Sequence, residues 1–202
     1  MLDRAFRLTF KNLSTFVLIA AVVALPLHVV YAATFQRVIA VSELHDDISR
    51  FPKTRQIRNV GRDQLRNARL GLLAVTLVEI AALPLVIRAA RRTLEDDERG
   101  LLPTVTRSWA GALAPTHGAL LRALRRHLGP LLVGLVVALV VGILIERIGT
   151  LLIEPLPDDD AWGGVALVQA AARSLAAPFL AVPWAVASLE KSPERVVTPD
   201  VY

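Results

Sequence analysis

The chain contains four long apolar stretches, which are separated by polar and charged segments. Residues 12–36 and 128–145 contain no Asp, Glu, Lys or Arg, while residues 70–87 contain a single acid and residues 161–189 a single base. A helix of about 18 or more apolar residues crosses the roughly 30 Å hydrocarbon core of a bilayer. We therefore expect an all-α polytopic membrane protein, a four-span transmembrane helix bundle with spans at about 14–33, 70–90, 129–145 and 164–189.

Two segments next to the spans have the pattern of amphipathic helices that lie at the membrane interface. Residues 2–11 place Leu2, Phe6 and Phe10 on one helix face and most of their charges elsewhere. Residues 115–128 separate leucines from arginines in the same way. We expect one interfacial helix before the first span and another before the third.

The fourth apolar stretch leaves two interpretations open, because it contains Pro178 and Pro183. It is either one long span, or an interfacial segment at 161–174 followed by a short span that begins near Leu175. No Pro-, Gly- or Ser-rich linker divides the chain, so residues 1–202 are expected to form a single integral membrane domain.

Composition supports the membrane assignment and limits the classes of partner that we expect. The chain is 54% hydrophobic with a mean hydropathy of +0.50, and it has no cysteine, which excludes disulfides and thiolate chemistry. A net charge of +5 on short loops favours contact with anionic lipid headgroups. Nucleic acid is not an expected partner, because the basic residues are not interleaved with exposed aromatic ones. The use of 20 Arg against 3 Lys is typical of a bacterial protein from a GC-rich genome.

The distribution of Lys and Arg predicts the orientation in the membrane. With both termini in the cytoplasm, the cytoplasmic segments hold 13 basic residues and the outer segments hold 9. Basic residues favour the cytoplasmic side, so we expect a bacterial plasma-membrane protein with both termini cytoplasmic. This orientation places the basic loop 34–69 on the outer side, against the trend. The acidic loop 146–163 lies on the same side.

Glu79 and Arg173 are the two charges inside apolar stretches, and we expect them to form an intramembrane pair. Glu79 lies nine residues after Leu70 and Arg173 lies nine residues after Gly164, which is about 14 Å along a helix in each case. In the predicted orientation spans two and four run in the same direction, so both charges have the same depth. Pairing lowers the cost of burying either one alone. Thr76 and Gln169 are close enough in sequence to join a polar cluster, whose role is either a static link between helices or part of a transport path. The remaining alternative is that the fourth span starts later and Arg173 extends to the outer interface.

His28 lies in the first span, with no second histidine near its depth. For a lone histidine in a membrane helix, we expect a hydrogen bond to a backbone carbonyl rather than a role as a proton carrier.

A basic stripe precedes the second span, with arginines spaced three and four residues apart. This spacing aligns the guanidinium groups along one face of a helix that can continue into the span. We expect the stripe to bind an acidic surface, or else to be a solvated face. Its members are Arg55, Arg58, Arg62, Arg66 and Arg69.

Small residues at four-residue spacing in the third span predict a helix-packing face. Gly134, Ala138 and Gly142 would let another helix approach closely. The alternative is that the spacing only reflects the abundance of Ala and Gly in this chain.

No motif for nucleotide binding, ester hydrolysis or zinc catalysis occurs in the sequence. We therefore expect no catalytic residue, no cofactor and no metal, and a non-enzymatic subunit or scaffold of a membrane or envelope assembly. Its expected partner is another membrane protein or a second copy of the chain. The alternatives are a transport component with a polar path at Glu79 and Arg173, and a lipid-modifying membrane enzyme.

Parts of the chain resemble the membrane-domain family found with bacterial glycerophosphoryl diester phosphodiesterases and related stand-alone integral membrane proteins. The resemblance rests on LDRAFRLTFKN at the start, on ALLRALRRHLGPLL before the third span, and on a closing span with prolines at 178–189. The tyrosine-rich end typical of that family is replaced by SLEKSPERVV. The resemblance implies a membrane domain and supplies no functional residue.

Overall fold

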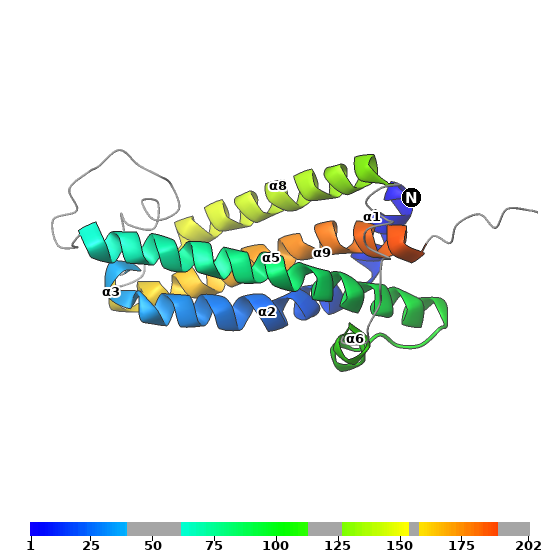
Figure 1. Cartoon of the computed structure of the whole chain (residues 1–202), viewed down its shortest axis with the longest axis horizontal. Helices are drawn as coiled ribbons and strands as arrows, with labels where there is room; N and C mark the ends of the chain where they lie inside the picture. The colour runs from blue at the N-terminus through cyan, green and yellow to red at the C-terminus, as the bar shows by residue number, and fades with distance from the viewer. Residues whose placement is uncertain (40–61, 113–126, 154–157, 190–202) are drawn as a thin grey trace, which may run out of the picture.

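The computed structural model describes residues 1–39, 62–112, 127–153 and 158–189, and the regular structure in these ranges is helical. Four helices are long and apolar enough to cross a membrane, which confirms the expected four-span helix bundle (Figure 1). The chain is therefore a multi-pass membrane protein. The long helices are α2 (Leu13–Thr34), α5 (Arg62–Glu98), α8 (Leu128–Ile153) and α9 (Asp158–Leu189), and the short ones are α1 (Leu2–Lys11), α3 (Gln36–Ile39) and α6 (Val105–Ala112).

Three of the long helices extend beyond the predicted spans. α5 has 37 residues and α8 has 26, because a helix keeps its backbone hydrogen bonds where its sequence becomes charged. The fourth stretch is one continuous helix of 32 residues that passes through Pro178 and Pro183. This continuity excludes an interfacial segment followed by a separate short helix.

α9 is the central helix of the bundle. It packs against α2, α8, α5 and α1, and Figure 1 shows it behind α5 and α2, with α8 on its far side from α2. Within its most apolar window 56% of the residues are buried, compared with 11% for α5. Side chains on α9 are therefore positioned by several neighbouring helices at once.

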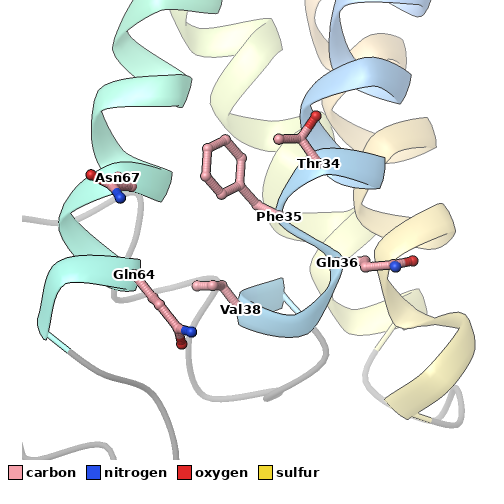
Figure 2. Close-up of a pocket in the computed structure, with 6 residues that line it drawn as sticks. All are labelled: Thr34, Phe35, Gln36, Val38, Gln64 and Asn67. Atoms are coloured by element: carbon pink, nitrogen blue, oxygen red, sulfur yellow. The ribbon is translucent and has the colours of Figure 1, made fainter.

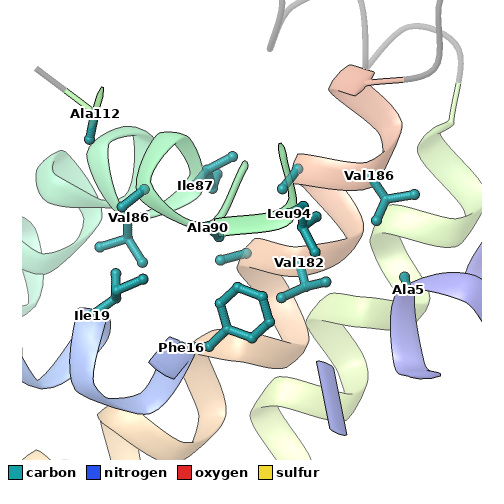
Figure 3. Close-up of a cluster of buried hydrophobic side chains, with 13 residues drawn as sticks. Ala5, Phe16, Ile19, Val86, Ile87, Ala90, Leu94, Ala112, Val182 and Val186 are labelled. Atoms are coloured by element: carbon teal, nitrogen blue, oxygen red, sulfur yellow. The ribbon is translucent and has the colours of Figure 1, made fainter. Parts of the chain in front are cut away.

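The main hydrophobic core lies at the end of the bundle that contains the amino terminus, here called the N-terminal end. Figure 3 shows Phe16 and Ile19 of α2 meeting Val86 and Leu94 of α5 and Val182 of α9. Where such side chains leave water, their burial stabilises the fold by about 1.5–3 kcal/mol each. Inside a membrane, the stabilisation comes from close packing between the helices.

α1 occupies the predicted residues and is attached to the bundle. The rings of Phe6 and Phe10 pack against Phe179 of α9, with centroids 6.3 Å and 5.8 Å away. Two ion pairs connect the charged side of α1 to the end of α5: Arg4–Glu98 at 2.6 Å and Lys11–Asp97 at 2.8 Å. The predicted interfacial helix at 115–128 lies almost entirely outside the described residues.

α5 ends in a tight turn that needs glycine. Gly100 has a φ of 71°, and the N–H groups of Gly100 and Leu101 donate to the carbonyls of Asp97 and Asp96. A left-handed residue just after a helix is most easily glycine. The turn directs the chain toward α6, which packs back against α5.

Candidate functional site at mid-depth of the bundle

A polar cluster joins three of the long helices within their apolar segments. Arg173 of α9 places Nε 3.6 Å from Oε2 of Glu79 in α5. The other carboxylate oxygen, Oε1, lies 3.1 Å from Nε2 of His28 in α2, and Nδ1 of His28 lies 3.0 Å from Oε1 of Gln169 in α9. These four side chains form a continuous chain of contacts, here called the mid-depth cluster.

The close approach of α5 to α2 brings His28 and Glu79 to the same height. A Cβ on Gly71 would collide with the ring of Phe35, so α5 passes directly beside the end of α2. Phe35 comes seven residues after His28, and Gly71 comes eight residues before Glu79. Because the two helices run in opposite directions, these nearly equal offsets bring the two side chains to about the same level.

The cluster can hold a proton in two arrangements. A neutral imidazole donates from Nε2 to Glu79 and accepts at Nδ1 from the Gln169 amide after rotation of that amide. A charged imidazolium donates from both nitrogens to the carboxylate and the amide oxygen. The Gln169 amide can therefore bond to the neutral or the charged ring, with its nitrogen or its oxygen turned toward Nδ1.

Burial differs sharply across the mid-depth cluster. His28 is 1% exposed and Gln169 is 5% exposed, and the Glu79 side chain is 16% exposed. The Arg173 side chain is 51% exposed, although it belongs to the most buried helix. The cluster is thus closed on the His28 side and uncovered on the Arg173 side.

Sequence reasoning identified part of this cluster. The structure brings Glu79 and Arg173 together and adds Gln169, as the depth argument expected. The expected backbone-carbonyl partner for His28 is wrong, because its ring contacts the side chains of Gln169 and Glu79. Thr76 instead donates to the carbonyl of Leu72 in its own helix, at 3.0 Å.

The small residues of α8 face α9. A Cβ on Gly134 would lie 2.8 Å from the carbonyl oxygen of Phe179, and one on Gly142 would lie 3.5 Å from Cβ of Ala176. Ala138, between them, is 7% exposed. The sequence analysis missed Gly149, where a Cβ would collide with Val168. These residues form one continuous seam between α8 and α9.

The seam predicts that Gly134→Ala destabilises the protein. The new methyl group meets a backbone oxygen, which moves only if α8 shifts, and overpacking of this kind typically costs about 1–3 kcal/mol. Gly129→Ala in the same helix is the matched control, because its Cβ would meet no atom within 4 Å. Thermal unfolding in detergent should separate the two variants, and equal stability would mean that Gly134 is not in close contact with α9.

Part of the basic stripe lies in the described region. Arg66 is exposed and Arg69 is partly buried on the first turns of α5, which runs on into the span. Arg62 begins α5, while Arg55 and Arg58 lie outside the described residues. The predicted continuity of the stripe with span two therefore holds from Arg62 onward.

A buried carboxylate at the N-terminal end was not anticipated. Asp96 is 0% exposed, its two oxygens have no hydrogen-bond donor, and Nε of Arg92 lies 3.6 Å from Oδ1. One turn earlier, the hydroxyl of Thr93 lies 2.8 Å from that of Ser108 in α6. Asp96 lies in a run of four acids, and nothing in this run distinguishes it from its neighbours, which are at least partly exposed in the structure.

The cavity in Figure 2 lies at the opposite end of the bundle from the N-terminus. Its volume is about 420 Å³, and its described lining consists of Thr34, Phe35, Gln36, Val38, Gln64 and Asn67. These six residues provide neutral amides, one hydroxyl and apolar groups. They include no acid or base, and the hydroxyl of Thr34 donates to the carbonyl of Val30 in its own helix, at 2.7 Å.

Comparison of the chain with protein-family models, with curated proteins and with solved structures finds no match in any of the three. The resemblance to the phosphodiesterase-associated membrane domains therefore stays a prediction. Within the described ranges, no three His, Asp or Glu side chains are grouped closely enough to hold a metal ion.

Proposed function

We propose that this protein is a non-enzymatic subunit or scaffold of a membrane assembly. The observation that supports this most directly is the half-exposed side chain of Arg173, at mid-depth on the central helix. A charged group at this depth costs about 2.5–3.5 kcal/mol on membrane-insertion scales, and lipid tails cannot accept its hydrogen bonds. A second transmembrane helix that covers Arg173 would remove this cost.

The alternative of an outward-reaching Arg173 is weaker. A long basic side chain near a helix end can extend to the interface, but here the Nε group is engaged by Glu79. The arginine also lies about 16 Å along α9 from Trp162, which begins the apolar part of the helix. Coverage by a partner accounts for both the contact and the exposure.

Crosslinking in intact membranes tests the proposed role. The protein, purified in mild detergent after crosslinking, is expected to migrate as a complex larger than its own 21.9 kDa, with a fixed stoichiometry. Recovery as a lone monomer under several crosslinkers would contradict the subunit role.

A transport component is the second candidate, and the His28–Glu79 contact is the observation that favours it. A carboxylate beside an imidazole inside a membrane is a common arrangement for moving protons. Proton or solute flux into liposomes that is abolished by His28→Leu would support this candidate over the scaffold. If liposomes that contain the protein pass neither protons nor solute, the scaffold role is the better explanation.

We propose that the protein lies in a bacterial plasma membrane with both termini in the cytoplasm. The Lys and Arg distribution supports this, and it places Asp158 and the basic stripe on the outer side near anionic headgroups. A cysteine at Asp158 should be labelled from outside by a membrane-impermeant maleimide, and one at Leu120 should not. The reverse pattern would invert the topology.

A further inference from the structure

The surface beside Arg173 forms a strip along α9 that the described residues leave partly uncovered. Arg173, Ala177 and Leu180 follow a spacing of four and three residues, which places them on one helix face. All three are partly or largely exposed, whereas Ser174, Pro178 and Phe179 beside them are buried. Ala177 has a short side chain, so a second helix could approach the backbone closely there.

The hydrogen-bonding capacity of the mid-depth cluster is not used up within one chain. The contact with Glu79 engages Nε of Arg173, and a guanidinium has further N–H donors on its outer nitrogens. The Glu79 carboxylate accepts from His28 and faces Arg173, and its oxygens have additional lone pairs. The cluster can therefore both donate to and accept from a neighbour at the same depth.

Charge balance restricts what that neighbour can be. Glu79 and Arg173 already neutralise each other, so a partner that brought one carboxylate or one base to this depth would leave an unbalanced charge in the membrane. A second copy of the chain brings one acid and one base, and the resulting group of four charges is neutral. It also matches donors with acceptors in both directions, as a twofold symmetric interface requires.

We propose that two copies of this chain pack along the strip formed by Arg173, Ala177 and Leu180, with each Arg173 donating to Glu79 of the partner subunit. This inference rests on the proposed subunit role and specifies its partner. Both copies insert with the same orientation, so the twofold axis runs along the membrane normal. Residues close to that axis, such as Ala177, then lie next to their own counterparts.

The chain contains no cysteine, so single-cysteine variants report this geometry without background. Ala177→Cys, oxidised in native membranes with copper phenanthroline, is expected to give a disulfide-linked dimer. Val22→Cys is the control at similar depth, because Val22 is 54% exposed on α2, away from the strip. We expect the Ala177→Cys dimer to exceed the control by about tenfold, the effect of a difference of about 1.4 kcal/mol. Equal yields would overturn the proposal.

The second part of the experiment tests whether the dimer yield depends on the charge of Arg173. Adding Arg173→Gln to the Ala177→Cys variant should lower the dimer yield about sevenfold, since polar contacts between membrane helices average about 0.6 kcal/mol and here two are lost. Arg107→Gln, at an exposed position on α6, should leave the yield unchanged. If Arg173→Gln fails to accumulate, Arg173→Lys replaces it, because it keeps the charge but loses the forked donor geometry.

The outcomes separate this proposal from the subunit role. A monomeric Ala177→Cys protein that co-purifies with a different membrane protein in an Arg173-dependent way would refute self-association and retain the subunit role. A monomer without any partner would refute both. A dimer whose yield does not depend on Arg173 would refute the proposed charge exchange.

Discussion

Replacing Glu79 alone by Gln is expected to destabilise the protein more than replacing Glu79 and Arg173 together. The single variant leaves the Arg173 guanidinium at mid-depth without its carboxylate, whereas the double variant removes both charges. We expect a loss of about 2 kcal/mol or more in the unfolding free energy for the single variant, on the scale of inserting one charge into a bilayer.

The measurement is a double-mutant cycle on unfolding in detergent, with Glu79→Gln, Arg173→Gln and the combined variant. A coupling energy of about 1 kcal/mol or more identifies a direct pair, because it exceeds the average polar contact between membrane helices. Thr76→Val, three residues before Glu79 in the same helix, is the control, since its hydroxyl bonds only to Leu72 of α5. Additive effects of the two charge substitutions would show that the pair does not form.

His28→Leu is expected to cause the second large effect, a loss of about 2–3 kcal/mol. His28 is 1% exposed and links Gln169 to Glu79, so leucine leaves buried polar atoms of both partners without a hydrogen bond. Leucine is similar in size, which limits any cavity and isolates the polar loss. Thermal unfolding in detergent measures it.

A control variant and a double variant test whether the loss of stability in His28→Leu comes from its hydrogen bonds. Val30→Ala, two residues away on a side chain that is 65% exposed, should change stability little. Combining His28→Leu with Gln169→Leu should cost less than the two single losses added together, because the amide is then no longer left without a partner. A combined loss equal to that total would argue against the His28–Gln169 hydrogen bond.

The apolar pattern predicted the four spans because membrane thickness fixes the number of apolar residues that a helix needs. It could not predict where the helices end. α5 continues from Ile87 to Glu98 through four acids and three arginines, since helical hydrogen bonding does not depend on hydropathy. The one-helix form of the fourth stretch was also open, because prolines are tolerated inside membrane helices.

The candidate site was predictable where a single rule applied. Depth counting brought Glu79 and Arg173 together, because both spans start at recognisable boundaries and carry one charge each. His28 was misassigned because an uncharged histidine in an apolar helix gives no sign of which face it occupies. The burial of Asp96 depends on α6 packing back against α5 after the Gly100 turn, a tertiary arrangement that no local pattern specifies.

The exposed arginine is the reason that we propose an assembly rather than an isolated bundle. α9 is covered by α2, α5, α8 and α1, yet the described residues leave half of the Arg173 side chain open. An isolated chain would present a charge to lipid at the depth where it costs most. The Glu79 contact reduces this cost, and a second chain would complete the coverage.

Native mass spectrometry of the protein released from membranes tests this central claim most directly, with the wild type compared with Arg173→Gln. The wild type is expected to appear as an assembly of more than one chain, and the variant is expected to lose most of that assembly in favour of the 21.9 kDa chain. A wild type that appears only as the single chain, or an assembly that Arg173→Gln leaves intact, would contradict the claim that a partner covers Arg173.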